Sequence, residues 1–199
     1  MIICLTGGLA SGKSTAVKHL ANKGAHVIDA DVLGHRAYEP GNKAHAQIIS
    51  EFGKDVCSDG DYIDRRVLGS LVFGKPDKLK KLTDIVWPEI RRMVEEEITS
   101  VRNRNPDQVI VLEAAVLFEA GWQNIGDEVW VIAVDKETAV QRSMLRDSSA
   151  REDVEKRLDA QLTNDQRTSL ADQVIENNLD EITLLRQLDL AWRSSTGRQ

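Results

Sequence analysis

The chain has 199 residues and a formal net charge of −6, with 41% hydrophobic and 29% charged residues. This length and apolar content suffice for one large domain, and the negative charge argues against a general nucleic-acid or anionic-membrane binder. Two cysteines, Cys4 and Cys57, are too few for a disulfide framework or a cysteine metal set. The sequence shows no secretory signal or membrane-spanning run, so we expect a cytoplasmic protein without nucleic-acid or membrane partners.

The first elements form a strand, a glycine-rich loop and a helix. Residues 2–5 are apolar, residues 7–14 read G-x-x-x-x-G-K-S, and residues 14–23 have helical periodicity. This context indicates a phosphate loop rather than a glycine-rich turn with a chance lysine. We expect Lys13 to reach the β- and γ-phosphates of ATP and to act in catalysis, and the Ser14 hydroxyl to bind Mg²⁺. The residues of the loop expected to bind ATP are Gly8, Ala10, Ser11, Gly12, Lys13, Ser14 and Thr15.

A second short strand, residues 26–28, ends in Asp29-Ala30-Asp31. The carboxyl ends of strands line the ligand crevice of an open α/β sheet, so both acids are candidates for the site. We assign Asp31 to catalysis, because a kinase needs a carboxylate near the acceptor hydroxyl. Asp29 is a candidate supporting residue, and the alternative is that one of the two caps the following helix.

Residues 32–105 have helical patterns and no strand signal. Apolar spacing predicts helices around residues 48–52, over 65–73 and over 79–86, and Pro88 is expected to end the third and open a fourth. About 70 helical residues are too many for a simple crossover between strands. We interpret this block as a substrate-binding insert, with a packing scaffold as the alternative.

The strands resume with residues 109–112, a continuous apolar run typical of a strand buried on both faces. Glu113 follows at the carboxyl end and is a candidate for orienting Mg²⁺ through water. Further strands are expected at 128–134 and 174–175, with helices at 136–146 and 179–192 and a frayed tail from 193. The residues expected to face inward are Ala139, Val140, Met144 and Leu145 in the first of these helices, and Ile182, Leu185, Leu188, Leu190 and Trp192 in the second. The fold predicted from this order is α/β, a three-layer P-loop fold with a five-stranded parallel sheet.

A charged segment lies between the helix at 136–146 and the last strand. One interpretation is a lid that closes over ATP and brings arginines to the phosphates. The other is a solvated helical surface with ion pairs such as Asp153 with Arg157. Arg142 and Arg146 are one helical turn apart, so both can point toward the site, and we assign both to catalysis.

A GTPase switch is the competing class. Residues 31–34 match D-x-x-G, but the guanine-specific N-K-x-D motif is absent, because Asn42-Lys43-Ala44-His45 ends in histidine. A short P-loop sheet with a helical insert and an arginine-rich lid instead favours a small-molecule kinase.

Several further motifs occur in order along the chain. They are Leu5-Thr6-Gly7-Gly8, Val27-Ile28-Asp29-Ala30-Asp31, Glu39-Pro40-Gly41, Phe52-Gly53, Asp64-Arg65 with Leu68 and Val72-Phe73, Leu117-Phe118-Glu119-Ala120-Gly121, and Arg146-Asp147. In this combination the chain resembles the dephospho-CoA kinase family along nearly its whole length. Segments such as Ile85-Val86-Trp87-Pro88 resemble the kinase domain of the bifunctional eukaryotic CoA synthase more closely still.

The resemblance implies that ATP phosphorylates the ribose 3′-hydroxyl of 3′-dephospho-CoA, the last step of CoA biosynthesis, with Mg²⁺ as cofactor. It implies a core at 1–31, 107–147 and 168–199, a helical CoA-binding insert at 32–106 and a lid at 148–167. It matches Asp31 to the acid that orients or deprotonates the acceptor, and Asn177 to the adenine side of the ATP site. The residues assigned to the acceptor are Asp29, Arg65, Trp87, Leu117, Phe118 and Glu119.

Two positions depart from the family pattern. Trp87 stands where most bacterial members have histidine, and Glu113 stands where most have aspartate, followed here by Ala114-Ala115 rather than Val-Pro. Two alternative functions remain: another small-metabolite or nucleoside kinase of the P-loop class, or a non-catalytic nucleotide-binding regulator.

Overall fold

The structure is a computed structural model that describes residues 1–58 and 60–198. It separates into two compact units, one of Met1–Ile28 with Val101–Gln199 and one of Asp29–Ser100. We describe each unit by itself. No helix in the described part of the chain has an apolar stretch long enough to cross a bilayer.

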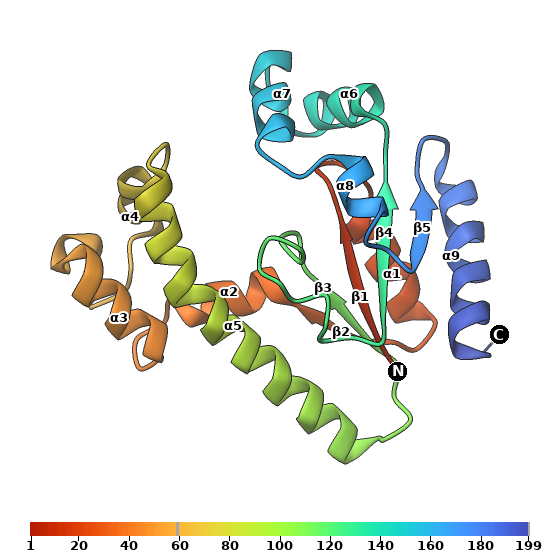
Figure 1. The fold of residues 1–199 in the computed structure, drawn as a ribbon, viewed down its shortest axis with the longest axis horizontal. Helices are drawn as coiled ribbons and strands as arrows, with labels where there is room; N and C mark the ends of the chain where they lie inside the picture. The colour runs from red at the N-terminus through yellow and green to blue at the C-terminus, as the bar shows by residue number, and fades with distance from the viewer. Residues whose placement is uncertain (59, 199) are drawn as a thin grey trace. The chain divides into compact units, whose positions relative to one another are not determined.

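The first unit is built on a five-stranded parallel sheet in the order β2-β3-β1-β4-β5 (Figure 1). The strands are β1 (Ile2–Gly7), β2 (His26–Asp29), β3 (Ile110–Glu113), β4 (Glu128–Ala133) and β5 (Gln173–Glu176). The central strand β1 pairs with β3 on one side, where Leu5 is opposite Glu113, and with β4 on the other, where Thr6 is opposite Val131. The predicted fold class and strand number are therefore confirmed.

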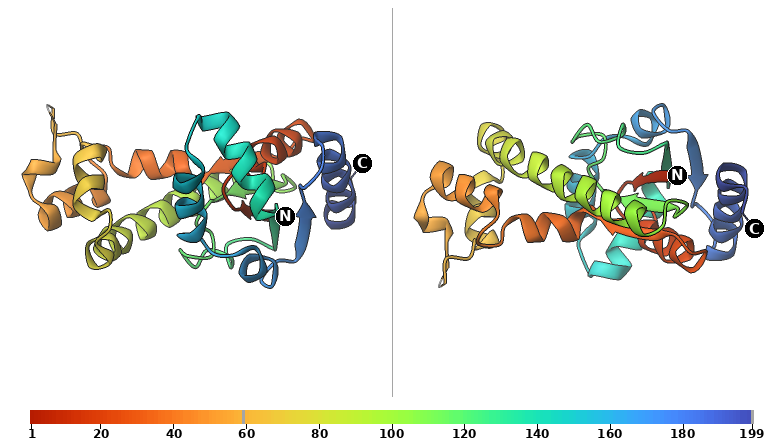
Figure 2. Two further views of the ribbon diagram at one scale, coloured as in Figure 1. Left: turned by 90° about the horizontal axis from the view of Figure 1, so that it is seen from above. Right: turned by 90° about the horizontal axis from the view of Figure 1, so that it is seen from below.

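One face of this sheet is covered by α1 (Lys13–Asn22) and α9 (Glu181–Thr196), which lie side by side in Figure 2. Alternate residues of a strand point to one face, so β1 contributes Ile3 and Leu5 to this core. The buried partners are Ala16, Leu20, Val109, Val111, Trp130, Ile132, Ile175, Leu184, Leu188, Ala191 and Trp192. This core fixes the position of β1, and β1 leads into the phosphate loop.

The last helix differs from its prediction in phase and in length. The predicted inward residues Leu188 and Trp192 are buried, but Ile182 and Leu190 are exposed and Leu184 is buried instead. The tail was expected to fray from Arg193, but α9 continues to Thr196. The Ser195 hydroxyl lies 2.6 Å from a carboxylate oxygen of Glu128, and this hydrogen bond holds the final turn against β4.

The second unit is helical, as predicted. It contains α2 (Ala30–Ala37), α3 (Lys43–Phe52), the short 3-10 helix η1 (Lys54–Val56), α4 (Arg65–Val72) and most of α5 (Pro76–Arg104). Figure 1 shows α3 and α4 on either side of the connection that contains η1, and both helices contact η1.

The predicted helix break at Pro88 is wrong, because α5 is one helix of 29 residues with Pro88 inside it. An internal proline removes one backbone hydrogen bond and costs about 3 kcal/mol. The apolar stripe continues through the proline, with Val86 and Ile90 buried on either side. Burying such side chains contributes about 1.5–3 kcal/mol each, so packing outweighs the local penalty.

The part of the chain between β4 and β5 forms three helices in the first unit. They are α6 (Lys136–Asp147), α7 (Arg151–Asp159) and α8 (Asn164–Thr168). The predicted pair of Asp153 with Arg157 does not form, since Arg157 pairs with Asp147 at 3.5 Å and Asp153 faces Lys156 at 3.8 Å.

Candidate active site

The phosphate loop joins the end of β1 to the start of α1. Gly12 stands at the N-cap of α1 with φ +95°, a conformation that residues with a Cβ rarely adopt. A Cβ on Gly12 would also overlap the side-chain amide of Asn177. Glycine is therefore required here both by the backbone and by the neighbouring side chain.

Asn177 lies at the carboxyl end of β5 and is buried. Its Nδ2 donates to the carbonyl oxygen of Ser11 at 2.8 Å, and its backbone N–H donates to the carbonyl of Ala133 at 2.8 Å. The predicted ATP-side residue thus supports the phosphate loop from behind. It also lines a pocket of about 240 Å³ together with Ala10 and Thr15.

A second pocket, of about 290 Å³, contains most of the predicted ATP-binding residues. It is lined by Ala10, Ser11, Gly12, Lys13, Ser14, Thr15, Arg142 and Arg146. Lys13 Nζ donates to the carbonyl oxygens of Gly7 at 2.9 Å and Gly8 at 3.4 Å. Backbone N–H groups at a helix N-terminus together with a lysine form a site for phosphate groups.

The two predicted catalytic arginines have different environments. Arg142 donates to the carbonyl oxygens of Asn177 at 2.7 Å and Leu179 at 2.9 Å, so it ties α6 to the loop after β5. Arg146 forms a bidentate pair with Asp147, at 2.7 Å and 2.8 Å. This pairing lowers the pKa of Asp147 to about 2 and raises the pKa of Arg146. Both side chains line the phosphate-loop pocket, which agrees with the spacing argument.

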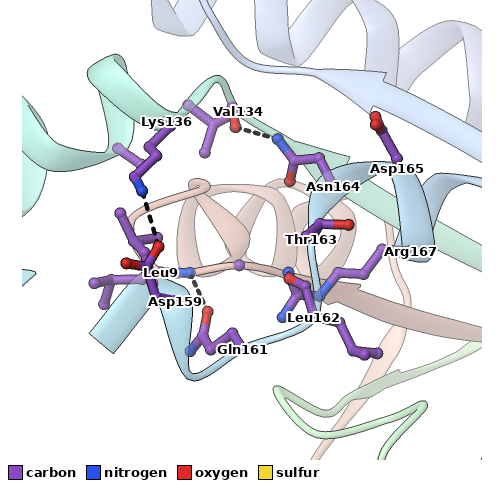
Figure 3. Close-up of a pocket in the computed structure, with 13 residues that line it drawn as sticks. Leu9, Val134, Lys136, Asp159, Gln161, Leu162, Thr163, Asn164, Asp165 and Arg167 are labelled. Carbon is purple, nitrogen blue, oxygen red and sulfur yellow. Dashed lines mark hydrogen bonds and ion pairs between the residues drawn. The ribbon is translucent and has the colours of Figure 1, made fainter. Parts of the chain in front are cut away.

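The segment 158–167 forms a further pocket, of about 410 Å³, against Gly8 and Leu9 (Figure 3). Gln161 Oε1 accepts a hydrogen bond from the backbone N–H of Leu9 at 3.1 Å. Lys136 pairs with Asp159 at 2.8 Å on the other side of the pocket. The end of the predicted lid is therefore bonded to the first turn of the phosphate loop.

Arg167 and Gln161 lie at this pocket, and the sequence interpretation assigned neither to the site. Arg167 is the buried arginine of the described residues. The sequence placed it in an arginine-rich segment, but charge and spacing do not show which arginine of such a segment is buried. Glu119, predicted to bind the acceptor, lies 3.9 Å from Arg167 Nη2.

The other predicted acceptor residues near Glu119 differ in exposure. Leu117 is fully buried, so its side chain belongs to the core, and Phe118 is half-buried. Glu113 is the last residue of β3, which pairs with β1. The backbone N–H of the next residue, Ala114, donates to the carbonyl oxygen of Leu5 at 3.1 Å.

The remaining predicted acceptor residues belong to the unit 29–100. Asp29 Oδ1 accepts from the backbone N–H groups of Asp31 at 2.8 Å and Val32 at 3.0 Å, so Asp29 is the N-cap of α2. This is the alternative that the sequence left open, and it leaves the exposed Asp31 carboxylate outside the cap.

Arg65 stands at the start of α4, after the capping residue Asp64. Its Nη1 lies 2.8 Å from Nε2 of His35, and its guanidinium carbon lies 5.9 Å from the ring centre of Tyr38. Burial raises the pKa of Tyr38, and the Arg65 charge opposes this. Trp87 is half-buried on α5. The unit thus presents the Arg65 cation beside the rings of His35 and Tyr38.

Candidate metal ligands are sparse. The described residues contain no cluster of three or more His, Cys, Asp or Glu side chains able to hold an ion. The predicted pair, Ser14 and Glu113, supplies one hydroxyl and one carboxylate. Mg²⁺ usually keeps several waters and binds substrate phosphates, so it does not require an all-protein cage.

A parallel sheet with a phosphate loop after its central strand and arginines over that loop defines a phosphotransferase of the P-loop class. A sequence profile described as dephospho-CoA kinase matches residues 1–182. The chain belongs to the dephospho-CoA kinase family, and the resemblance seen in the sequence is confirmed.

Relatives match over most of their length. A Geobacter sulfurreducens protein named dephospho-CoA kinase is 42% identical over 191 residues, covering 96% of each chain. A solved Thermus thermophilus structure matches with a TM-score of 0.83 and 34% identity, covering 98% of this chain and 96% of that one. Dephospho-CoA kinase from Campylobacter jejuni matches with a TM-score of 0.73 and 28% identity over 98% of both chains.

Proposed function

We propose that this chain transfers the terminal phosphoryl group of ATP to the ribose 3′-hydroxyl of 3′-dephospho-CoA, giving CoA and ADP. This is the last step of CoA biosynthesis, and we place it in the cytoplasm. The observation that carries the proposal is the family match over residues 1–182 combined with a complete phosphate loop ending in Lys13 and Ser14.

The loop supplies the donor side of the reaction. Phosphoryl transfer depends mainly on positioning and on stabilising charge. We assign the loop N–H groups and Lys13 to the phosphates, and Arg142 and Arg146 to the same charge. Arg142 also donates a hydrogen bond to the backbone carbonyl of Asn177. Replacing Arg142 would therefore also disturb Asn177, which supports the phosphate loop. Ser14 and Glu113 are the residues that would hold Mg²⁺, which supplies charge neutralisation when bound.

For the acceptor side we propose the helical unit and the loop after β3. The proposal includes a division of the chain into three parts. These are an acceptor-binding insert (32–106), a lid (148–167) and a core (1–31, 107–147 and 168–199). Asp31 orients or deprotonates the 3′-hydroxyl, while Asp29 fixes the start of the helix that carries it. Arg65 and Trp87 provide a cation and an aromatic surface for a nucleotide-like acceptor.

An acceptor panel tests the proposal. The protein is incubated with Mg-ATP and either dephospho-CoA, AMP, shikimate or gluconate, and ADP release is followed. We expect ADP release with dephospho-CoA alone, and its loss in Lys13→Ala. Turnover with another acceptor would support a different small-metabolite kinase, and ATP binding without turnover on any acceptor would support a regulator.

A further inference from the structure

Arg167, on α8, is a buried charge with few partners. Its side chain is 3% exposed, Nη1 donates to the carbonyl oxygen of Leu162, and Nη2 lies 3.9 Å from a carboxylate oxygen of Glu119. Its Nε has no hydrogen-bond partner among the described residues. The guanidinium is therefore neither solvated nor fully paired.

Such a charge is costly to keep. Taking an ion out of water costs several kcal/mol unless good pairing offsets it, and 3.9 Å is beyond hydrogen-bond distance. Burial lowers the pKa of Arg167, and the negative charge of Glu119 opposes this. An anion placed beside the guanidinium would provide the missing stabilisation.

The neighbours of Arg167 show where such an anion would lie. A Cβ on Gly8 would lie 3.4 Å from Arg167 Nη1 and 3.7 Å from Gln161 Oε1. On the loop itself, Lys13 Nζ lies 3.4 Å from the carbonyl oxygen of Gly8. Two cations thus lie next to one turn of the loop. The lysine of a phosphate loop reaches the β- and γ-phosphates, so this turn is at the terminal end of the phosphate chain.

The other arginines of segment 148–167 are in a different situation. Arg151 lies 2.5 Å from Glu137 and 2.8 Å from Glu155, and Arg157 lies 3.5 Å from Asp147. These side chains are about half exposed, so solvent and carboxylates already stabilise their charges. Arg167 is the arginine of this segment whose charge is buried without a close carboxylate partner among the described residues.

We propose that Arg167 is a positioning residue for the terminal phosphoryl group of ATP. Its buried charge lies behind the Gly8–Leu9 turn, and Gln161 holds that turn through the Leu9 N–H (Figure 3). The inference rests on the proposed function only in taking ATP as the donor. Glu119 partly neutralises the guanidinium and so tunes its effect on the phosphate.

The test is the ratio of affinities for Mg-ATP and Mg-ADP, measured by calorimetry without any acceptor. In Arg167→Met we expect this ATP preference to fall about 10-fold, because the guanidinium charge acts on the phosphate across the turn rather than through a direct hydrogen bond. Arg167→Lys, which keeps the charge, should recover part of the preference. Arg157→Met is the matched control from the same segment and should keep the wild-type ratio.

A wild-type ratio in folded Arg167→Met, or an equal fall in Arg157→Met, would overturn the proposal. If Arg167→Met does not fold, Glu119→Gln decides, because that side chain is 29% exposed and its replacement keeps its shape. We expect the ATP preference to rise in Glu119→Gln, and an unchanged or lower preference would contradict the proposal. These binding ratios do not depend on turnover, so a failed acceptor assay would reject the proposed function and leave this test intact.

Discussion

Asn177 and Ser11 are 166 residues apart in the chain, and the Asn177 amide donates a hydrogen bond to the Ser11 carbonyl oxygen at 2.8 Å. This bond ties the residue that follows β5 to the phosphate loop. The bond is buried, so removing it leaves a carbonyl group without solvent or a partner.

We therefore expect Asn177→Ala to lower the free energy of unfolding by about 1–3 kcal/mol and to weaken ATP binding. Urea denaturation and calorimetric titration with Mg-ATP measure the two effects. Asn178→Ala is the matched control, because Asn178 accepts a hydrogen bond from the backbone N–H of Asp135. It should leave ATP affinity at the wild-type value, and an equal loss in both variants would show that the Asn177 bond has no special effect on the loop.

Arg142 and Arg146 should respond differently to replacement by methionine. Arg142 donates to two backbone carbonyls, so Arg142→Met should reduce stability by about 1–3 kcal/mol as well as activity. Arg146 pairs only with its exposed neighbour Asp147 among the contacts described, so Arg146→Met should reduce kcat with little change in thermal midpoint. Equal thermal shifts in the two variants would contradict this division of roles.

Replacing Asp31 or Asp29 by asparagine distinguishes the roles of the two residues. Asp31→Asn should lower kcat by about 10²- to 10⁴-fold, the range for general base catalysis, with modest change in ATP affinity. Asp29→Asn should keep the helix cap, because asparagine caps helices as well as aspartate does. Steady-state kinetics with dephospho-CoA decide the matter, and near wild-type turnover in Asp31→Asn would remove Asp31 from the catalytic role.

The pair of helices α1 and α9 gives a pH prediction. Asp189 lies 2.9 Å from His19 Nε2 and 3.0 Å from Lys23 Nζ, and these partners lower the pKa of Asp189. A carboxyl group with a lowered pKa stabilises the fold fully above its unfolded pKa of about 3.9, and the contribution disappears as the pH falls through the folded pKa.

The stability difference between wild type and Asp189→Asn should consequently shrink as the pH falls from about 5 toward 3. Urea denaturation at each pH measures it. A difference that grows as the pH falls below about 5 would contradict the assigned ion pairs.

The sheet, the phosphate loop and most helix positions could be predicted from the sequence, because each has a strong local signal. Residues 2–5 and 109–112 are apolar runs, and the loop between residues 7 and 14 has a fixed spacing. The errors arose where burial depends on distant partners. Leu145 was expected to face inward and is 85% exposed, while Ser143 is buried instead. Pro88 was expected to end a helix whose apolar stripe in fact continues.

The site was predictable to a lesser degree. The nucleotide residues follow from one motif, and the structure brings them into one pocket with Arg142 and Arg146. Arg167 and Gln161 could not be found by periodicity, since both come from a polar segment whose burial depends on packing against Gly8 and Leu9. Likewise, Leu117 carries a family motif, but its side chain is in the core.

The most direct test of the proposed function is product analysis after one turnover. The protein is mixed with Mg-ATP and dephospho-CoA, and ³¹P NMR with mass spectrometry identifies the product beside Lys13→Ala as the control. We predict one new ribose 3′-phosphomonoester for each ADP formed, and none with Lys13→Ala. ADP without a phosphorylated acceptor, or phosphate at another position of the acceptor, would contradict the proposed function.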